Sequence, residues 1–194
     1  MADAPAKHRL PEAERRKVIL AAATEVVAER GVEAASISEI AERAGITRPI
    51  VYDHFRTKQD IVVALIEHHH AVLMSALGQV GAGPRLDKRT LRRIIVAYLH
   101  QVDADPGGWR ILCLEPSRDP RISALQRRAA GEVNLVVAQM LNPSTPMKAR
   151  LMAVEGARAA VNALADLRRH DPGIGIDELA DSAVTLVWEG LRRI

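Results

Sequence analysis

Residues 36–60 read SISEIAERAGITRPIVYDHFRTKQD, and this stretch decides the fold of the first part of the chain. Ser36 and Glu39 have the spacing of a capping box, in which each side chain bonds a free backbone N–H at a helix start. Gly45 ends this helix, because glycine adopts a positive φ without strain. Thr47 can cap a second short helix that follows at once. Two small helices joined by a glycine turn form a helix-turn-helix, whose second helix fits the major groove of DNA.

Composition excludes several classes of protein. The 194 residues carry a formal net charge of +3, and 48% of them are apolar, as expected of a soluble globular chain. The single cysteine, Cys113, excludes an intrachain disulfide framework and fits a reducing compartment. We find no apolar run near the roughly 20 residues that a membrane helix needs, and no secretory signal at the N-terminus. These features predict a cytoplasmic protein.

Helical periodicity continues through the rest of the chain, and no segment alternates as a strand does. We therefore expect an all-α protein of about nine helices. Residues 1–10 are predicted to form a disordered basic arm, residues 11–56 a three-helix domain, and residues 57–194 a larger helical domain that begins with a long helix. Beyond that helix, periodic segments and breaks predict helices over 91–102, 109–115, 122–141, 146–170 and 177–193.

The second helix of the motif offers side chains suited to DNA. Arg48 can bond guanine with both ends of its guanidinium, and Pro49 and Ile50 can touch a thymine methyl group. Ser36 and Ser38 lie at a helix N-terminus, which attracts phosphate. Four further residues are suited to phosphate contacts: Thr47, Tyr52, His54 and Lys58. Each of these residues also has a structural alternative, as a solvated charge, a helix cap or a packing residue.

From about Glu12 to Ile66, the chain resembles the N-terminal domain of the tetracycline-repressor (TetR) family of bacterial transcription regulators. The resemblance is carried by Gly31, Ser36-Ile37, Ile40-Ala41, Ala44-Gly45-Ile46-Thr47, Val51-Tyr52, His54-Phe55 and Lys58. It implies base contacts at Arg48, Pro49, Ile50 and Ser38, and phosphate contacts at Ser36, Thr47, Tyr52, His54 and Lys58. Asp53 departs from a phosphate-binding surface, because its carboxylate would repel DNA unless it points away or accepts from a cytosine amino group.

The same resemblance implies a transcription regulator whose C-terminal domain binds an effector and forms a homodimer. We expect a repressor that leaves a palindromic double-stranded DNA operator when a small molecule binds, although the sequence leaves activation open. Small and apolar residues on the last two helices predict the dimer interface: Ala153, Gly156, Ala157, Ala160, Leu164, Leu179, Ala183, Leu186, Val187, Gly190 and Leu191. The alternative is that these stripes only bury an intrachain core.

The effector site is predicted between the helices of residues 58–164. Its candidate residues are Tyr98, Val102, Trp109, Leu112, Cys113, Leu135, Gln139, Met140, Met152, Glu155 and Asn162. Each of them can instead be a core residue. Because few aromatic residues lie outside the first domain, we expect a mainly aliphatic pocket for a lipophilic ligand.

No catalytic constellation stands out in the sequence. His68, His69 and His70 would point about 100° apart on a helix, and none has a histidine or carboxylate partner at the i, i+4 spacing of a helical metal pair. Cys113 has no nearby histidine or aspartate pattern and is expected in the core. We therefore expect no enzyme activity, no metal and no cofactor. Two alternatives of other classes are a helical protein-interaction module that reads no DNA sequence and an enzyme built on a helical bundle.

Overall fold

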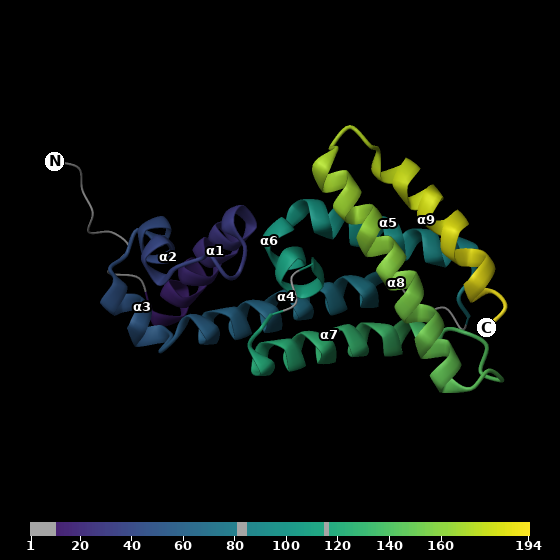
Figure 1. Ribbon diagram of the computed structural model, residues 1–194, viewed down its shortest axis with the longest axis horizontal. Coiled ribbons are helices and arrows are strands. Elements are labelled where there is room, and N and C mark those ends of the chain that lie inside the picture. Colours follow the sequence, from purple (N-terminus) through teal and green to yellow (C-terminus); the bar gives the residue numbers. More distant parts are fainter. Residues whose placement is uncertain (1–10, 81–84, 115–116) are drawn as a thin grey trace. The chain divides into compact units, whose positions relative to one another are not determined.

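The part of the chain that the structure describes is built from helices and contains no strand (Figure 1), which confirms the all-α prediction. The structure is a computed structural model that describes residues 11–80, 85–114 and 117–194, so the predicted arm over 1–10 lies outside the described residues. The helices are α1 (Glu12–Arg30), α2 (Ile37–Ala44), α3 (Arg48–His54), α4 (Lys58–Val80), α5 (Lys88–Ala104), α6 (Pro106–Trp109) with a π-helical turn over Arg110–Leu114, α7 (Pro120–Gln139), α8 (Met147–His170) and α9 (Ile176–Leu191).

The first of two compact units contains the described residues up to His69 together with Pro106–Gln126. Its apolar core takes side chains from α1, α2, α3, the first half of α4, the π-helical turn and the start of α7. The largest buried members are Ile19, Val27, Ile40, Val51, Phe55, Ile61, Leu65, Ile66, Ile111 and Ile122. The helix-turn-helix is therefore held by a core that also draws on two later segments of the chain.

The boundary between the units differs from the predicted division into residues 11–56 and 57–194. The first half of α4 and the segment Pro106–Gln126 belong to the first unit, and the rest of the described chain forms the second unit. The physical reason is the small size of the three-helix part. A piece of about 45 residues buries too small a share of its surface to be stable alone, so further apolar helices must cover it.

Helix α6 approaches the backbone of α1 closely at one glycine. We expected residues 105–108 to break the chain and a helix to begin at Trp109, but Pro106 begins α6, as proline can in a first helical turn. A Cβ atom added at Gly107 would lie 2.3 Å from the backbone oxygen of Thr24 and 2.8 Å from its Cγ2. The absence of a side chain at Gly107 is therefore what lets the two helices meet.

Replacement of Gly107 with alanine is expected to lower the free energy of unfolding by about 1–3 kcal/mol, because the new methyl group meets a backbone atom that cannot rotate away. Urea unfolding monitored by circular dichroism measures this change. The matched control is Gly131→Ala in α7, where a new Cβ has no neighbour within 4 Å. That change is expected to stabilise the helix by up to about 1 kcal/mol. Equal effects at both sites would contradict the close approach.

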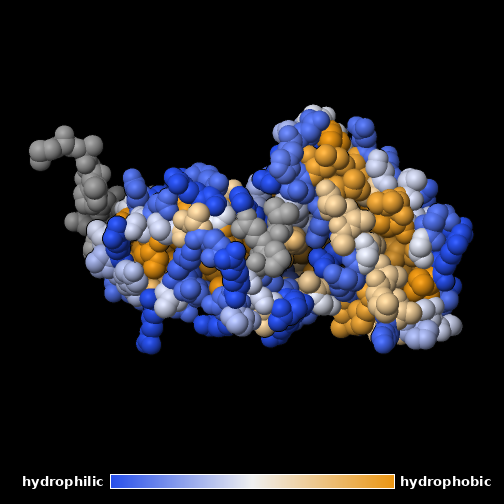
Figure 2. Space-filling view, in the orientation of Figure 1, coloured by the Kyte–Doolittle hydropathy of each residue, from blue (hydrophilic) through white to orange (hydrophobic). Residues whose placement is uncertain are grey.

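The second unit contains α5, α8 and α9, the second half of α4 and most of α7. Helix α9 packs on both α5 and α8. Arg92 of α5 bonds Asp177 and Asp181 of α9 at 2.8 and 2.6 Å, and Arg168 of α8 bonds Asp103 at 2.7 Å. Figure 2 shows apolar side chains gathered on the outer surface of α8 and α9, outside this intrachain packing.

Helix α4 corrects one expectation from the sequence. Its residues Lys58–Gln79 are long and apolar enough to cross a membrane by length and composition, although we expected no such run. Ile61, Leu65 and Ile66 of this helix are buried in the core of the first unit. Burial within the protein accounts for much of the apolar character of α4.

Candidate functional site

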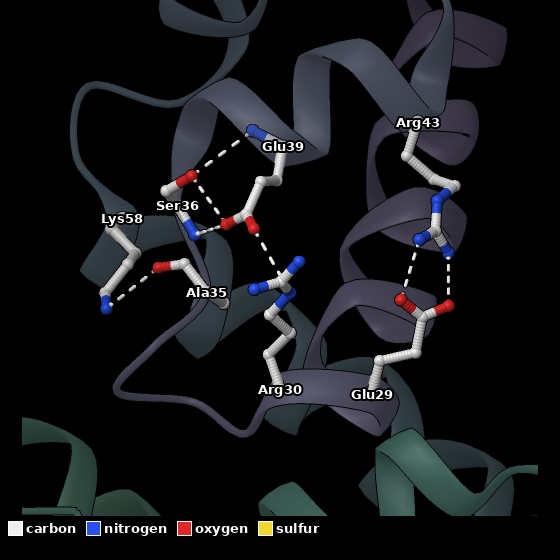
Figure 3. A network of polar contacts seen from close by, with 7 residues as sticks. All are labelled: Glu29, Arg30, Ala35, Ser36, Glu39, Arg43 and Lys58. Atoms are coloured by element: carbon white, nitrogen blue, oxygen red, sulfur yellow. Dashed lines mark hydrogen bonds and ion pairs between the residues drawn. The ribbon is translucent and has the colours of Figure 1, made fainter.

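The N-terminus of α2 is closed by the predicted capping box (Figure 3). The backbone N–H of Glu39 donates to Ser36 Oγ at 3.2 Å, and Ser36 N and Oγ both donate to Glu39 Oε2, at 3.1 and 2.7 Å. Arg30, the last residue of α1, pairs with the same carboxylate at 3.2 Å. The hydrogen bond from Ser36, and then the charge of Arg30, lower the pKa of Glu39 below its ordinary value. Because the Ser36 hydroxyl hydrogen is already donated, the geometry gives no support to a phosphate contact by Ser36.

The turn between α2 and α3 has the geometry predicted for a glycine turn. Gly45 has φ 66° and ψ 36°, the left-handed conformation, and its N–H donates to the carbonyl oxygens of Ala41 and Glu42. Ile46 N also bonds Ala41 O, at 3.0 Å. Thr47 occupies the N-cap of α3, but its side chain makes no cap hydrogen bond, contrary to the expected capping role. The exposed Thr47 hydroxyl therefore stays available to another group.

The outer face of α3 carries polar side chains that the protein does not use. Arg48, Pro49 and Asp53 are exposed, and half of the Tyr52 surface (50%) is accessible. Within the described part of the chain, the side chains of Arg48 and Tyr52 make no hydrogen bond or ion pair, and neither does that of the half-buried His54. These side chains can reach an external partner without breaking an internal contact.

Ile50 corrects one predicted base contact. Only 8% of its surface is exposed, and the adjacent Val51 is completely buried. In a helix of seven residues, two consecutive apolar residues are needed to cover the small core below it. Ile50 thus has little surface for a base. Ser38, in the first turn of α2, is half buried and keeps partial access.

Lys58 corrects a predicted phosphate contact. Its ammonium donates to the carbonyl oxygens of Val32 at 3.0 Å, Glu33 at 2.8 Å and Ala35 at 3.1 Å. An ammonium has three N–H donors, so all of them are occupied inside the unit. Lys58 therefore binds the connection between α1 and α2, and its ammonium has no donor left for a phosphate.

Two arginines near α3 were missed by the sequence analysis. Arg56 is exposed and directly follows Phe55, the C-cap residue of α3. Arg16 of α1 is also exposed, and its guanidinium carbon lies 4.9 Å from the centre of the Phe55 ring. The basic run Arg15-Arg16-Lys17 was the sequence signal that could have pointed to this position. Both arginines place positive charge near the C-terminal end of α3.

Arg43 of the first unit is paired with carboxylates, unlike Arg48. Arg43 of α2 donates two hydrogen bonds of 2.7 Å to Glu29 of α1 (Figure 3). It also pairs with Glu25 at 3.3 Å. The hydrogen bond from Arg43 lowers the pKa of Glu29, which stays ionised. The unpaired charge of Arg48 therefore contrasts with the neutralised charge of Arg43.

The predicted dimer residues fall into two groups in the second unit. Leu179, Ala183, Val187 and Leu191 are buried within the chain, as the alternative of an intrachain core requires. Three are exposed, namely Gly156, Leu186 and Gly190, and the other four are half buried: Ala153, Ala157, Ala160 and Leu164. Met152 and Leu167 of α8 are large exposed apolar residues that the predicted interface omitted. The outward face of α8 and α9, defined by Met152, Gly156, Leu167, Leu186 and Gly190, is hereafter the apolar face.

The predicted effector residues are divided between the two units. Trp109, Leu112 and Cys113 belong to the first unit, and the other candidates belong to the second. Val102, Trp109 and Met140 are buried, whereas Leu135, Gln139, Met152 and Glu155 are exposed. Met152 lies on the apolar face, so it is removed from the effector set.

Polar side chains link the helices of the second unit. Tyr98 of α5 donates to Asn162 of α8 at 2.6 Å, and Asn134 of α7 donates to Glu155 of α8 at 2.6 Å. Only 7% of the Asn134 surface is exposed, and its Oδ1 atom has no partner among the described residues. Asn134 was absent from the predicted effector set.

The three consecutive histidines of α4 take part in separate contacts. His69 Nε2 lies 3.1 Å from the Thr24 hydroxyl, and His70 Nε2 lies 2.7 Å from Glu132 Oε2. His68 packs its ring edge-to-face on His69, with 5.2 Å between the ring centres. Each histidine therefore has a contact within the protein that accounts for its presence in α4.

Comparison with known proteins agrees with this geometry. Residues 19–65 match the family model described as bacterial regulatory proteins, tetR family. The transcriptional activator FasR of Mycolicibacterium smegmatis is 28% identical over 191 residues, which cover 96% of this chain and 87% of that protein. The transcriptional repressor BepR of Brucella suis is 48% identical over 54 residues, which cover 28% of this chain and 26% of that protein.

Solved structures extend the likeness to both units. A TetR-like transcriptional regulator from Rhodococcus sp. RHA1 has a TM-score of 0.79 and 27% identity, covering 94% of this chain and 98% of that one. FadR from Bacillus subtilis, solved with stearoyl-CoA, has a TM-score of 0.70 over 88% of this chain and 96% of that one, and at 19% identity it shows the fold alone. Residues 19–65 are thus the helix-turn-helix DNA-binding domain of the tetR family of bacterial regulatory proteins, and nearly the whole chain is similar to TetR-like transcription regulators.

Proposed function

We propose that this regulator is a homodimeric repressor that binds a palindromic operator and releases it when a small lipophilic molecule binds. The observation that carries the proposal is the outer face of α3, where Arg48 is exposed and unpaired while Arg43 is held by carboxylates. The proposed base-reading residues are Arg48, Pro49 and Ser38. The proposed phosphate contacts are Thr47, Tyr52 and His54, with Arg16 and Arg56 added for their exposed charge.

A dimer formed through the apolar face would account for recognition of a palindromic operator. Gly156 and Gly190 have no heavy atom within 4 Å of an added Cβ, so the packing of one chain does not require glycine there. Glycine costs a helix about 1 kcal/mol relative to alanine, and a close approach by a second helix is a reason to keep it. A two-fold dimer then presents two copies of α3, which read half-sites about 34–36 Å apart.

The effector proposal rests on the composition of the second unit. Its interior is largely aliphatic, and the polar pairs Tyr98–Asn162 and Asn134–Glu155 offer a few hydrogen-bonding groups between helices. Small-molecule sites are usually apolar with a few such groups. The neighbours support a lipophilic class, since FadR was solved with stearoyl-CoA and SmeT with triclosan. We propose action by binding in the cytoplasm, without catalysis.

Operator selection tests the DNA part of the proposal. The purified dimer is incubated with random duplexes, and the bound fraction is sequenced after several rounds. We expect a palindrome whose half-sites are centred about 10 base pairs apart or at a multiple of that spacing. Selection of no sequence would favour the protein-interaction module instead.

Activation is the second candidate, because FasR, which matches nearly the whole chain, is named an activator. A reporter placed behind a promoter with the selected operator separates the two functions. Repression predicts more transcript when the regulator gene is deleted, and activation predicts less. Release is then tested by fluorescence anisotropy of the operator with long-chain acyl-CoA and triclosan as probes, and we expect a lipophilic probe to weaken binding roughly 5- to 150-fold.

Replacement of Asp53 with asparagine is expected to tighten operator binding about 5- to 30-fold. Asp53 is an exposed carboxylate on α3, and its repulsion with phosphate is worth on the order of 0.5–1 kcal/mol in each protomer. Anisotropy at low salt gives the largest effect, because salt screens exposed charges. Glu67→Gln, an exposed carboxylate on α4, is the control. Weaker binding together with lost preference at one base pair would instead show that Asp53 accepts from cytosine.

A further inference from the structure

Lys58 gathers three backbone carbonyl groups of the α1–α2 connection around its ammonium. The oxygens of Val32, Glu33 and Ala35 lie 3.0, 2.8 and 3.1 Å from Nζ. Figure 3 shows Lys58 reaching across from the start of α4 to Ala35. Hydrogen bonds from an ionised donor are roughly twice as strong as neutral ones. This is therefore a strong link between α4 and a loop far away in the sequence.

The chain needs hydrogen-bond donors at this place because the residues between α1 and α2 lie outside any helix. Gly31 turns the backbone with φ 82°, and the carbonyl groups of Val32, Glu33 and Ala35 follow it in a connection that has no helical hydrogen-bond ladder to pair them. Val32 and Ala35 are buried residues, and their bonds to the Lys58 ammonium are partly buried. A buried carbonyl without a partner costs about 1–3 kcal/mol. The three donors of one ammonium match the three oxygens.

Both ends of this link are held by capped helix termini. Ala35 directly precedes Ser36, whose capping box with Glu39 begins α2, and Arg30 of α1 pairs with the same Glu39. On the other side, Thr57 N donates to Asp60 Oδ2 and Asp60 N donates to Thr57 Oγ1, both at 3.1 Å, which fixes the start of α4. A movement of the first turn of α4 must therefore carry the N-terminus of α2 with it.

We propose that Lys58 is a positioning residue for DNA binding, which joins α2 to α4 so that the helix-turn-helix follows α4 as one body. The proposal rests on α3 being the DNA-contacting helix, as proposed above. Lys58 then supports operator affinity without touching a phosphate. The link also prevents α4 from moving without α3, so a displacement of α4 is passed on to the DNA-contacting helix.

A charge-preserving variant separates this role from phosphate binding. Arginine binds phosphate at least as well as lysine, but its planar fork cannot direct three donors at three converging oxygens. We expect Lys58→Arg and Lys58→Met both to lower operator affinity about 10- to 100-fold, measured by anisotropy on the full-length dimer at a temperature where each variant is fully folded. Lys148→Met, an exposed lysine of α8, is the control and should stay within about 2-fold. Wild-type affinity in Lys58→Arg would overturn the proposal.

Hydrogen exchange of the DNA-free protein tests the link independently of any operator. Without the ammonium, we expect the backbone amides of residues 36–40 to exchange at least 10-fold faster in Lys58→Met, with α5 and α9 unchanged as internal references. If Lys58 acted only by contacting a DNA phosphate, Lys58→Met would not change amide exchange in the DNA-free protein. Unchanged exchange would therefore overturn the proposal. Failure of the wild-type protein to select an operator would instead count against the proposed function, and the exchange experiment would still decide the role of Lys58.

Discussion

Replacement of Arg48 with alanine is expected to abolish sequence-specific operator binding while leaving the fold intact. Arg48 is exposed, and its side chain makes no hydrogen bond or ion pair with a described residue, so its removal costs the folded protein little. A bidentate arginine–guanine pair is worth about 1–3 kcal/mol of discrimination, and a two-fold dimer makes it twice. The combined loss of about 2–6 kcal/mol corresponds to roughly 30- to 20,000-fold in affinity. Anisotropy titration with the selected operator and with a scrambled duplex measures both affinity and preference.

Two control variants sharpen the Arg48 experiment. Arg43→Ala removes an arginine from the neighbouring helix α2, but Glu29 and Glu25 already neutralise this arginine, so we expect a change of about 3-fold at most. Arg48→Lys keeps the charge and loses the bidentate geometry, so non-specific binding should survive while base preference relaxes. If Arg48→Ala selected the same operator with the same affinity, α3 would not be the reading helix, and the protein-interaction module would become the better hypothesis.

Replacement of Leu186 with glutamate is expected to convert the dimer into monomers and thereby to abolish operator binding. Leu186 is 63% exposed on the apolar face. In a two-fold dimer formed through this face, both protomers would place the new carboxylate in the interface. Burying a leucine contributes about 1.5–3 kcal/mol, and a buried carboxylate without a partner costs several more. We expect the dissociation constant of the dimer to rise at least about 1,000-fold, measured by sedimentation.

Operator affinity should fall in parallel. A monomer contacts only one half-site, and two monomers must supply the free energy of dimerisation when they assemble on the DNA. The matched control is Leu135→Glu, which changes another partly exposed leucine, 41% accessible, on α7. We expect that variant to remain dimeric. Dissociation by Leu135→Glu but not by Leu186→Glu would move the dimer interface away from the apolar face. Circular dichroism is used to check that both variants keep their helices.

The local geometry of the helix-turn-helix was predictable from short-range rules. The capping box of Ser36 and Glu39 and the left-handed turn at Gly45 depend on residues three or four positions apart. Such contacts form wherever the helix forms, so spacing alone identifies them. The same rules could not say that Thr47 leaves its hydroxyl unused, because the bond that a cap makes depends on its rotamer.

The role of Lys58 could not be predicted, because phosphate and a cluster of carbonyl oxygens attract an ammonium for the same reason. Val32 lies 26 residues earlier in the chain, and only folding brings its carbonyl group to 3.0 Å from Nζ. Ile50 illustrates the same limit. A helix of seven residues has no clear periodicity, and the neighbouring helices decide which of its apolar side chains are covered.

Helix α9 shows what periodicity leaves open. An apolar residue every three or four positions indicates a face to be covered, but it does not name the surface that covers it. The structure assigns Leu179 and Val187 to the intrachain core and leaves Leu186 outside. The sequence by itself determined the helices, their caps and the helix-turn-helix, because these depend on neighbours along the chain. Only the tertiary structure decided which charges stay unpaired, which apolar face stays open and which loop Lys58 holds, because these depend on residues that meet only in the folded protein.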